Sequence, residues 1–463
     1  MPAGSPTALL RDLRALVGDR AVLPGDTAAY LADATETREI SGRADAVVLP
    51  ADTEQVATVV AFCHRHGLAI IPRGGGTGFA AGAVPLDGGV VVALERLNAI
   101  TALEPERWRA RVQAGVTTGT RARRARETGV YYPPDPGAAE TSQLGGNIAT
   151  NAGGPHSFKY GVTGAWVTGL EAVLAPGEVI RLGGAVRKDV AGYDLGALLV
   201  GSEGTLGIMT SVWVRLIPAP EAQLPVLAAY PDLASGCAAL ESVLAVGVTP
   251  ATLEYLDGAT VAAAAPAGLP QGIPESTGFV LIAEADGSVA EAQRVRGELL
   301  ELLGARASAT HAPTGLSEIR ALWRWRSAIS RAVTARRGGK VSEDIVVPIE
   351  HLAQAVSATL EIGKRHGLPA CSWGHAGDGN LHSSFLISRG DPAELEAAGA
   401  ASRDLFALAV ALGGSVSGEH GVGLTKRGAL ELQWSPAAVA RHEAIKALFD
   451  PAGLLNPGKK LAR

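Results

Sequence analysis

The sequence predicts a protein of mixed helix and sheet (α+β), with an α/β first part and a helix-rich second part. Short apolar strands alternate with helical stretches over about the first 130 residues, which is typical of α/β architecture. Glycine clusters in the first half, and long alanine-rich helical stretches begin after Pro218-Ala-Pro220. The early strands are expected at residues 46–50, 68–72, 90–94 and 109–113.

Residues with known capping preferences set the expected helix ends. Thr53 can cap a helix that runs to about His66 and ends at Gly67, and a second helix over 117–128 closes at Gly129. Beyond residue 218, helices are expected at 288–303, 316–336, 349–366 and 392–412, with strands near 279–283 and 371–373. We also assign Tyr193, Trp323 and Trp325 to the core.

Composition excludes several classes of function. Of the 463 residues, 47% are hydrophobic and 19% charged, which suits two or three domains with sizeable cores. The net charge of −5 gives no sign of a nucleic-acid or membrane-surface binder. The 58 glycines are about twice the usual share without any repeat, so the excess is expected in turns and binding loops.

Three scattered cysteines indicate a reducing compartment rather than a disulfide framework. They are also too few for a four-cysteine iron–sulfur cluster, so any electron relay would lie outside this chain. No membrane-spanning apolar stretch and no signal-peptide pattern are evident. We therefore expect a cytoplasmic protein, and peripheral attachment at the inner face of the membrane stays open.

Three glycine-rich segments indicate an extended phosphorylated ligand. They lie at residues 73–78, 145–154 and 201–208, and each could bring backbone N–H groups close to a phosphate. Taken singly, each segment suits ordinary turn chemistry equally well. The first segment is not a Rossmann motif, because no helix with a ribose-binding acid follows at the expected place. It is not a Walker motif either, because Gly-Lys-Ser/Thr is absent. Three together need a ligand as long as a dinucleotide.

The order of these motifs resembles the FAD-linked oxidases of the vanillyl-alcohol oxidase superfamily. The chain is most similar to the branch of D-lactate dehydrogenase, the glycolate oxidase large subunit and D-2-hydroxyglutarate dehydrogenase. The resemblance covers about residues 45–460 and implies a two-subdomain α/β FAD-binding domain followed by an α+β substrate or cap domain with an antiparallel sheet. The residues that would hold FAD are Pro72, Arg73, Gly74, Gly75, Gly76, Thr77, Gly78, Pro134, Asp135, Ser142, Gly145, Gly146, Asn147, Gly154, Gly161, Glu203, Gly204, Ile208 and Asn456.

The resemblance and the proline-rich junction give four expected segments. These are an N-terminal helical segment (1–44), the FAD-binding domain (45–218), the substrate or cap domain (219–412), and a C-terminal segment (413–463) that carries metal and base residues and returns to the FAD domain. Some relatives attach FAD covalently to a histidine. This sequence has no histidine between His66 and His156, so non-covalent FAD is expected.

Histidines and a glutamate form a second set of chemical residues. His375 and His382 lie seven positions apart, which would place them on opposite faces of one straight strand. A turn at Asp378-Gly379 could fold the segment back and bring both together. With Glu419, they could form an open divalent metal site, but the spacing equally suits structural histidines in turns. The resemblance assigns zinc or manganese to His375, His382 and Glu419, and the role of base to His420.

Basic residues around 324–340 allow two interpretations. A solvated basic helix face is the ordinary one, and a clamp on a substrate carboxylate is the other, since arginine grips carboxylates with two hydrogen bonds. The resemblance matches Arg326, Lys340 and Ser330 to substrate-binding positions.

The expected reaction is the FAD-dependent oxidation of a small-molecule D-2-hydroxy acid, of lactate, glycolate or 2-hydroxyglutarate type, to the 2-oxo acid. The metal would assist deprotonation of the hydroxyl, and hydride would pass to flavin N5. Two alternatives stay open: a flavin-dependent, non-redox transferase of the ether-lipid synthase type, and a flavin-carrying subunit of a multi-subunit oxidase complex. The sequence does not distinguish a quinone, a cytochrome or a partner subunit as electron acceptor, nor a homodimer from a hetero-complex.

Overall fold

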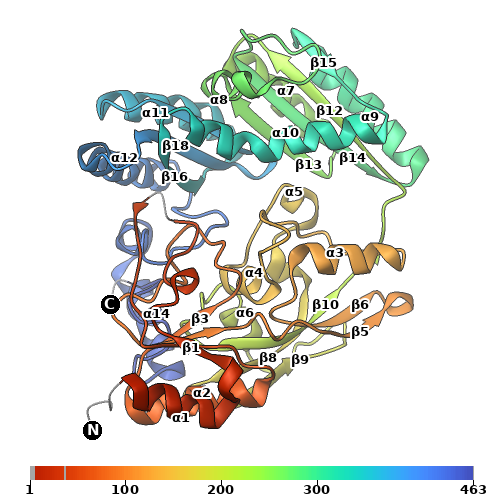
Figure 1. Cartoon of the computed structure of the whole chain (residues 1–463). Coiled ribbons are helices and arrows are strands. Elements are labelled where there is room, and N and C mark those ends of the chain that lie inside the picture. Colours follow the sequence, from red (N-terminus) through yellow and green to blue (C-terminus); the bar gives the residue numbers. More distant parts are fainter. Residues whose placement is uncertain (1–5, 36–37, 462–463) are drawn as a thin grey trace. The chain divides into compact units, whose positions relative to one another are not determined.

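The computed structural model describes residues 6–35 and 38–461, which form two units. The first unit comprises residues up to 154, 161–219 and 419 onward, and the second comprises 155–160 and 220–418. Residues 155–160 thus belong to the second unit, although the residues on both sides of them in the sequence belong to the first. Figure 1 follows this path by colour along the chain.

The first sheet of the first unit has four strands in the order β1 (Val22–Pro24), β2 (Ala46–Val48), β4 (Val90–Ala93) and β3 (Ile70–Arg73). Strands β2, β4 and β3 are parallel, and β1 is antiparallel to β2. The buried side chains of helices α1 (Pro6–Val17) and α2 (Thr53–His66) share one core with this sheet. The loop after β3 lies at the carboxyl end of these parallel strands. Ligands of α/β folds commonly bind at this end of the sheet.

Helix α2 shows where a local prediction was wrong by one residue. Asp52, rather than Thr53, caps the helix by accepting a hydrogen bond from the Gln55 backbone N–H at 2.8 Å. The Thr53 hydroxyl instead donates to Glu171 at 2.7 Å. The helix ends at Gly67, whose φ of 64° is left-handed, as predicted.

The second sheet of this unit has five antiparallel strands. Their order is β5 (Ile100–Glu104), β6 (Arg109–Gln113), β10 (Ile208–Arg215), β8 (Val167–Leu174) and β9 (Glu178–Gly183). The unit also holds α3 (Thr118–Glu127), α4 (Leu144–Thr150), α6 (Leu195–Leu199), α13 (Leu430–Gln433), α14 (Pro436–Phe449) and the short pair β7 (Val130–Tyr131) with β11 (Ile217–Pro218).

The second unit contains the antiparallel sheet that was predicted for it. Its seven strands lie in the order β15 (Ala309–His311), β12 (Ala222–Tyr230), β14 (Phe279–Gly287), β13 (Thr252–Asp257), β17 (Ala370–His375), β18 (Asn380–Ser388) and β16 (Gly338–Val346). Helices α7 (Leu233–Ala245), α9 (Val289–Gly304), α11 (Leu352–Arg365) and α12 (Pro392–Ala411) pack on one face. Helices α8 (Gly258–Ala264) and α10 (Leu316–Ala335) cover the other, and Figure 1 shows α10 lying across the sheet.

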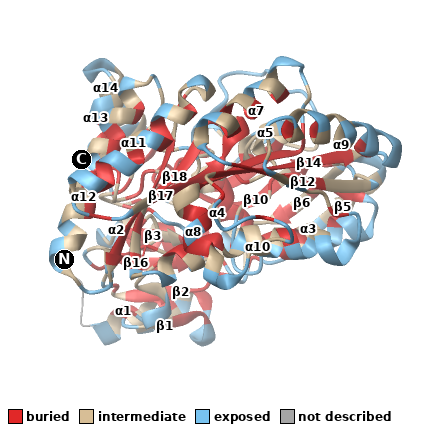
Figure 2. Cartoon of the chain, turned by 90° about the horizontal axis from the view of Figure 1, so that it is seen from above, coloured by how far each residue is buried: buried red, intermediate tan, exposed pale blue. Residues whose placement is uncertain are grey.

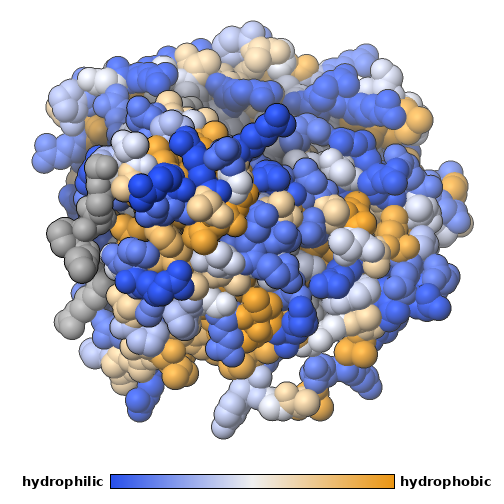
Figure 3. Space-filling model, turned by 60° about the horizontal axis from the view of Figure 1, so that its bottom comes forward, coloured by the Kyte–Doolittle hydropathy of each residue, from blue (hydrophilic) through white to orange (hydrophobic). Residues whose placement is uncertain are grey.

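Burial follows these layers. In Figure 2 the strands are mostly buried and the exposed residues lie on the outer sides of helices and in loops. On the face drawn in Figure 3, hydrophilic side chains predominate and apolar ones form small groups. Trp323 and Trp325 pack against the core as predicted, but the prediction for Tyr193 was wrong, because 95% of it is exposed. Among the described residues, no helix combines the length and apolarity that crossing a membrane requires.

Candidate functional site

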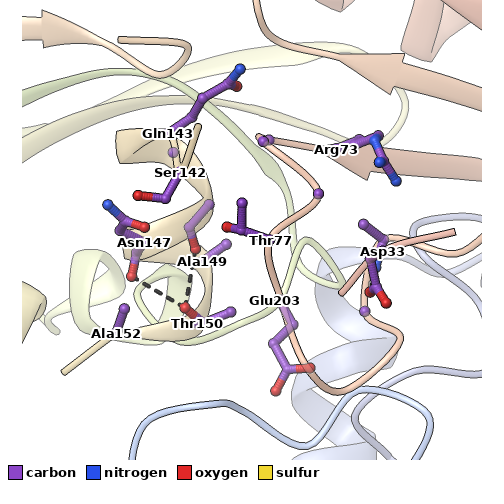
Figure 4. Close-up of a pocket in the computed structure, with 18 of the residues that line it drawn as sticks. Asp33, Arg73, Thr77, Ser142, Gln143, Asn147, Ala149, Thr150, Ala152 and Glu203 are labelled. Carbon is purple, nitrogen blue, oxygen red and sulfur yellow. Dashed lines mark hydrogen bonds between the residues drawn. The ribbon is translucent and has the colours of Figure 1, made fainter. Parts of the chain in front are cut away.

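The three glycine-rich segments meet around one cavity in the first unit. The cavity has a volume of about 220 Å³ and opens to solvent. The loop after β3, helix α4 and the loop before β10 form its walls, and Figure 4 shows these elements around it. The expected convergence of the segments on one extended site is therefore present in the fold.

Two kinds of glycine build this cavity. A Cβ on Gly75 would lie 2.0 Å from the Thr141 carbonyl oxygen, so glycine there lets two loops touch. Gly204 has a φ of +71°, and a Cβ there would lie 2.9 Å from Pro72 Cγ. At Gly78, by contrast, a Cβ would meet no atom within 4 Å. Gly78 thus leaves space for a ligand, whereas Gly75 and Gly204 bring the walls together.

Polar groups without protein partners line the same cavity. Within the described residues, the backbone N–H groups of Gly75, Gly76, Thr77 and Gly78 donate no hydrogen bond to the chain. The buried Oε1 of Gln143 likewise has no partner among the described residues. Buried polar groups are normally paired, so the Gln143 oxygen is positioned to accept a hydrogen bond from a ligand. The four loop N–H groups are less buried and are open to the acceptor groups of a ligand. Successive free N–H groups suit a pyrophosphate.

Most residues assigned to FAD by resemblance line this cavity. They are Pro72, Arg73, Gly74, Gly75, Gly76, Thr77, Gly78, Ser142, Gly145, Gly146, Asn147, Glu203, Gly204 and Ile208. The assigned residues outside the lining are Pro134, Asp135, Gly154, Gly161 and Asn456.

Arg73 and Asn456 have structural contacts that the sequence did not reveal. The Arg73 guanidinium donates to the backbone oxygens of Ala32 and Ala29 at 2.8 and 2.9 Å, and Figure 4 shows it directed away from Asn147. The Asn456 amide donates to the carbonyls of Gly82 and Glu203 at 2.9 and 2.8 Å. Both residues therefore hold loops that form the cavity.

Glu419 and His420 also line the cavity, and Glu203 fixes the segment that follows them. The two oxygens of Glu203 accept hydrogen bonds from the backbone N–H groups of Val422 and Gly423 at 2.9 and 2.6 Å. Lys460 adds an ion pair to the same carboxylate at 3.2 Å. The backbone beside His420 is thus held against a cavity wall by a buried carboxylate.

In the second unit, a hairpin brings His375 and His382 together. His375 ends β17 and His382 lies in β18, with the turn at Gly379, whose φ is +66°. The centroids of the two imidazole rings are 5.2 Å apart. The turn predicted from Asp378-Gly379 is confirmed, and it places both imidazoles on one face of the sheet.

A fully buried glutamate that the sequence did not single out adjoins this hairpin. Glu254 of β13 lies 2.5 Å from His375 Nδ1 and 2.5 Å from a terminal nitrogen of Arg326 in α10. Burial alone would raise the pKa of Glu254, but the contacts with His375 and Arg326 outweigh it and hold the pKa below its ordinary value. Arg326 is therefore no member of a solvated basic face, whereas Arg324 and Arg331 are exposed.

Lys340 and Ser330 lie together on the same side of the sheet. The Lys340 ammonium donates to the Ser330 hydroxyl at 2.5 Å and lies 4.8 Å from the centroid of the Trp373 ring. Burial lowers the pKa of Lys340 to about 8. Glu419 and His420 belong to the first unit, and the other predicted catalytic and metal-binding residues belong to the second.

Comparisons with known proteins agree with these features. Residues 44–183 match the FAD binding domain family, and residues 219–460 match the C-terminal domain of FAD linked oxidases. The chain belongs to the FAD-linked oxidase family. This oxidoreductase is 38% identical to glycolate oxidase subunit GlcD of Bacillus subtilis over 436 residues, 94% of this chain and 92% of that relative.

Two further relatives of this FAD-linked oxidase are named D-lactate dehydrogenases. The protein of Anaerostipes hadrus is 33% identical, with 90% of this chain and 89% of the relative covered. The probable mitochondrial D-lactate dehydrogenase of Danio rerio is 32% identical, with 98% and 91% covered.

Solved structures confirm the fold. Substrate-bound p-cresol methylhydroxylase superposes with a TM-score of 0.80 over 99% of this chain and 97% of that chain, at 19% identity. Alkyldihydroxyacetonephosphate synthase gives a TM-score of 0.76 over 98% and 85%, also at 19% identity. The vanillyl-alcohol oxidase type of fold predicted from sequence is confirmed.

Several lining residues of this FAD-linked oxidase escaped the sequence analysis. Asp33 comes from a leading segment without a motif, so no signal could have placed it at the cavity. Phe79 and Gln143 adjoin the glycine-rich motifs and Thr150 lies within one, so their positions in the sequence were a usable signal. The Thr150 hydroxyl donates to the Gly146 carbonyl at 3.2 Å within α4, as Figure 4 shows.

Proposed function

We propose that this chain oxidises a D-2-hydroxy acid, of lactate or glycolate type, to the 2-oxo acid with non-covalently bound FAD. Relatives above 30% identity are named glycolate oxidase subunit or D-lactate dehydrogenase, and they cover most of this chain. Bound FAD would supply the acceptor for the electrons and the Cα hydrogen that the substrate loses. The protein's own part is to bind the acid, orient it and remove its hydroxyl proton.

One observation in the second unit carries the choice of an acidic substrate. Nε of Arg326 is buried and has no hydrogen-bond partner among the described residues. A buried guanidinium nitrogen without an acceptor is suited to a ligand carboxylate. Lys340, held by Ser330, adds a positive charge to the same face, so a substrate carboxylate would be bound by two cations.

His420 is the proposed base. An imidazole suits this role because its ordinary pKa lies near neutral pH, so it can take a proton from the hydroxyl at one ring nitrogen and release it to water. Its place on the cavity wall, with Glu203 fixing the residues that follow, supports the assignment.

We propose that His375, His382 and Glu419 hold a divalent metal, zinc or manganese. The donor set fits, because imidazole nitrogen and carboxylate oxygen are ordinary ligands of both ions. The metal would supply Lewis-acid stabilisation of the deprotonated hydroxyl. Within the second unit, the Gly418 N–H donates to Asp344 at 2.9 Å, and Asp344 pairs across from His382. Gly418 directly precedes Glu419 in the sequence.

Anaerobic mixing of the FAD-loaded protein with D- and L-lactate, glycolate and D-2-hydroxyglutarate tests the proposal. We expect the flavin absorbance to bleach with a D-2-hydroxy acid and to stop doing so after treatment with a chelator. His420→Ala should retain FAD and lose bleaching. His442→Ala is the matched control, because His442 stacks on Trp434 at 4.1 Å and does not line the cavity. Unchanged bleaching by His420→Ala would remove this histidine from the reaction.

The two alternatives stand differently. The likeness to the ether-lipid synthase is 19% identical and concerns the fold alone, so non-redox transfer has the weaker support. The Bacillus subtilis relative is named a glycolate oxidase subunit, which supports the proposal that this chain acts within a hetero-complex. Turnover of the isolated chain with an artificial electron acceptor would show that catalysis needs no partner.

A further inference from the structure

Glu254 occupies a position that neither the motifs nor the family comparison singles out. Its side chain is completely buried in β13, at a site paired directly with His375 of β17. One oxygen meets His375 Nδ1 and the other meets Arg326, each at 2.5 Å. Within the second unit, this carboxylate joins the proposed metal-binding strand to the helix that carries the proposed substrate arginine.

The contact with His375 determines which ring nitrogen carries hydrogen. An ionised carboxylate only accepts hydrogen bonds, so Nδ1 must be the donor. In a neutral imidazole, Nε2 then keeps its lone pair and becomes the atom available to a metal. Histidine ligands are commonly oriented in this way by a carboxylate on the other nitrogen.

The contact with Arg326 has a second effect. Glu254 engages one terminal nitrogen and thereby fixes the plane of the guanidinium. The buried Nε, which has no partner among the described residues, then faces a defined direction. A rigid planar fork loses less entropy when it grips a carboxylate than a freely rotating one does.

We infer that Glu254 is a positioning residue, which orients His375 for the metal and Arg326 for the substrate carboxylate at the same time. The inference rests on the proposed function. It goes beyond that function by coupling the proposed metal ligand and the proposed substrate arginine through one fully buried carboxylate.

Glu284 provides a matched control on the neighbouring strand β14. Its side chain is also almost fully buried, and it accepts a hydrogen bond from Trp323 of the same helix α10 at 2.8 Å. It contacts His156 rather than His375. Glu284→Gln therefore reports the general effect of neutralising a buried carboxylate under α10.

The experiment uses full-length, FAD-loaded protein and two measurements. The first is the affinity for Zn²⁺ and Mn²⁺, titrated against a chromophoric chelator. Glu254→Gln should weaken it about 10- to 100-fold, the usual effect of losing such a supporting group, and Glu284→Gln should not. The second is the imidazole ¹⁵N spectrum of the metal-free protein. It should show hydrogen on Nδ1 of His375 in the wild type and in Glu284→Gln, and a smaller fraction of that form in Glu254→Gln, because an amide oxygen is a weaker acceptor than a carboxylate.

The outcomes separate the inference from the proposed function. Equal metal affinity of Glu254→Gln and the wild type would overturn the inference and leave the proposed metal centre standing. A wild-type protein that binds neither ion would overturn both. If Glu254→Gln does not fold, the wild-type spectrum still decides, because hydrogen on Nε2 of His375 in place of Nδ1 would contradict the role given to Glu254.

Discussion

The rings of Phe79 and His420 lie 4.8 Å apart between centroids, inclined at 46°. Phe79 belongs to the glycine-rich loop after β3, and His420 lies more than 300 positions further along the chain, yet both line the same cavity. The proposed base thus has an aromatic neighbour that limits its rotation.

Phe79→Ala should slow flavin reduction about 2- to 10-fold. The reason is that such ring contacts contribute about 0.5–1.5 kcal/mol, and about 1.4 kcal/mol is a factor of ten. Stopped-flow reduction under anaerobic conditions measures the effect. Phe79→Tyr keeps the ring and should react at nearly the wild-type rate, so an equal loss in both variants would count against this role of the ring.

Glu203→Gln should release the backbone beside His420. The variant weakens two charge-assisted hydrogen bonds, to Val422 and Gly423, each contributing about 1.5–3 kcal/mol. We expect a lower unfolding temperature of the FAD-loaded protein together with slower flavin reduction. Lys460→Met removes only the partly exposed ion pair at the same carboxylate and should have a smaller effect. Equal losses in the two variants would contradict this explanation.

Gly75→Ala should reduce the stability of the protein, whereas Gly78→Ala should weaken FAD binding. The first places a methyl group 2.0 Å from the Thr141 carbonyl oxygen, so it should destabilise the protein even without FAD. The second adds a methyl group to open space in the cavity, so it should leave the apoprotein stable and weaken FAD binding. Thermal unfolding of apoprotein and FAD titration measure the two effects. Tight FAD binding by Gly78→Ala would show that the cofactor does not approach this residue.

Substrate binding should weaken as pH rises through about 8. Burial lowers the pKa of Lys340 to about 8, so its charge is present below that pH and lost above it. Under the proposed contact between this ammonium and the substrate carboxylate, KM should increase up to about tenfold per pH unit above 8. Arginine stays charged in this range, so Lys340→Arg should flatten the rise. A steady-state KM profile from about pH 6.5 to 9.5 checks this, and a wild-type KM independent of pH would contradict it.

Local sequence signals predicted the features that depend on neighbouring residues. The hairpin that joins His375 and His382 follows from a glycine in a left-handed turn, and the end of helix α2 follows from Gly67 in the same backbone conformation. Both are properties of a few consecutive residues, so the sequence was sufficient to predict them.

Features that depend on distant partners were not predictable in this way. Glu254 is one of two acids in β13, and its role depends on contacts with residues 72 and 121 positions away. Tyr193 is aromatic, and aromatic residues usually lie in a core. It lies instead in a run of exposed residues, and no local sequence signal predicts that this run is exposed. Asp33 reaches the cavity from a segment that carries no motif.

The segment 155–160 limits how this protein can be divided into fragments. Lys159 and Tyr160 each lie 2.5 Å from the buried carboxylate of Asp286, and His156 lies 3.3 Å from Glu284. A fragment of residues 220–418 would keep the whole seven-stranded sheet but lack these three partners. Asp286 would then lose Lys159 and Tyr160, and Glu284 would lose His156 while keeping Gln223 and Trp323. We therefore expect such a truncated product to be less stable unless a peptide carrying these six residues is supplied in trans.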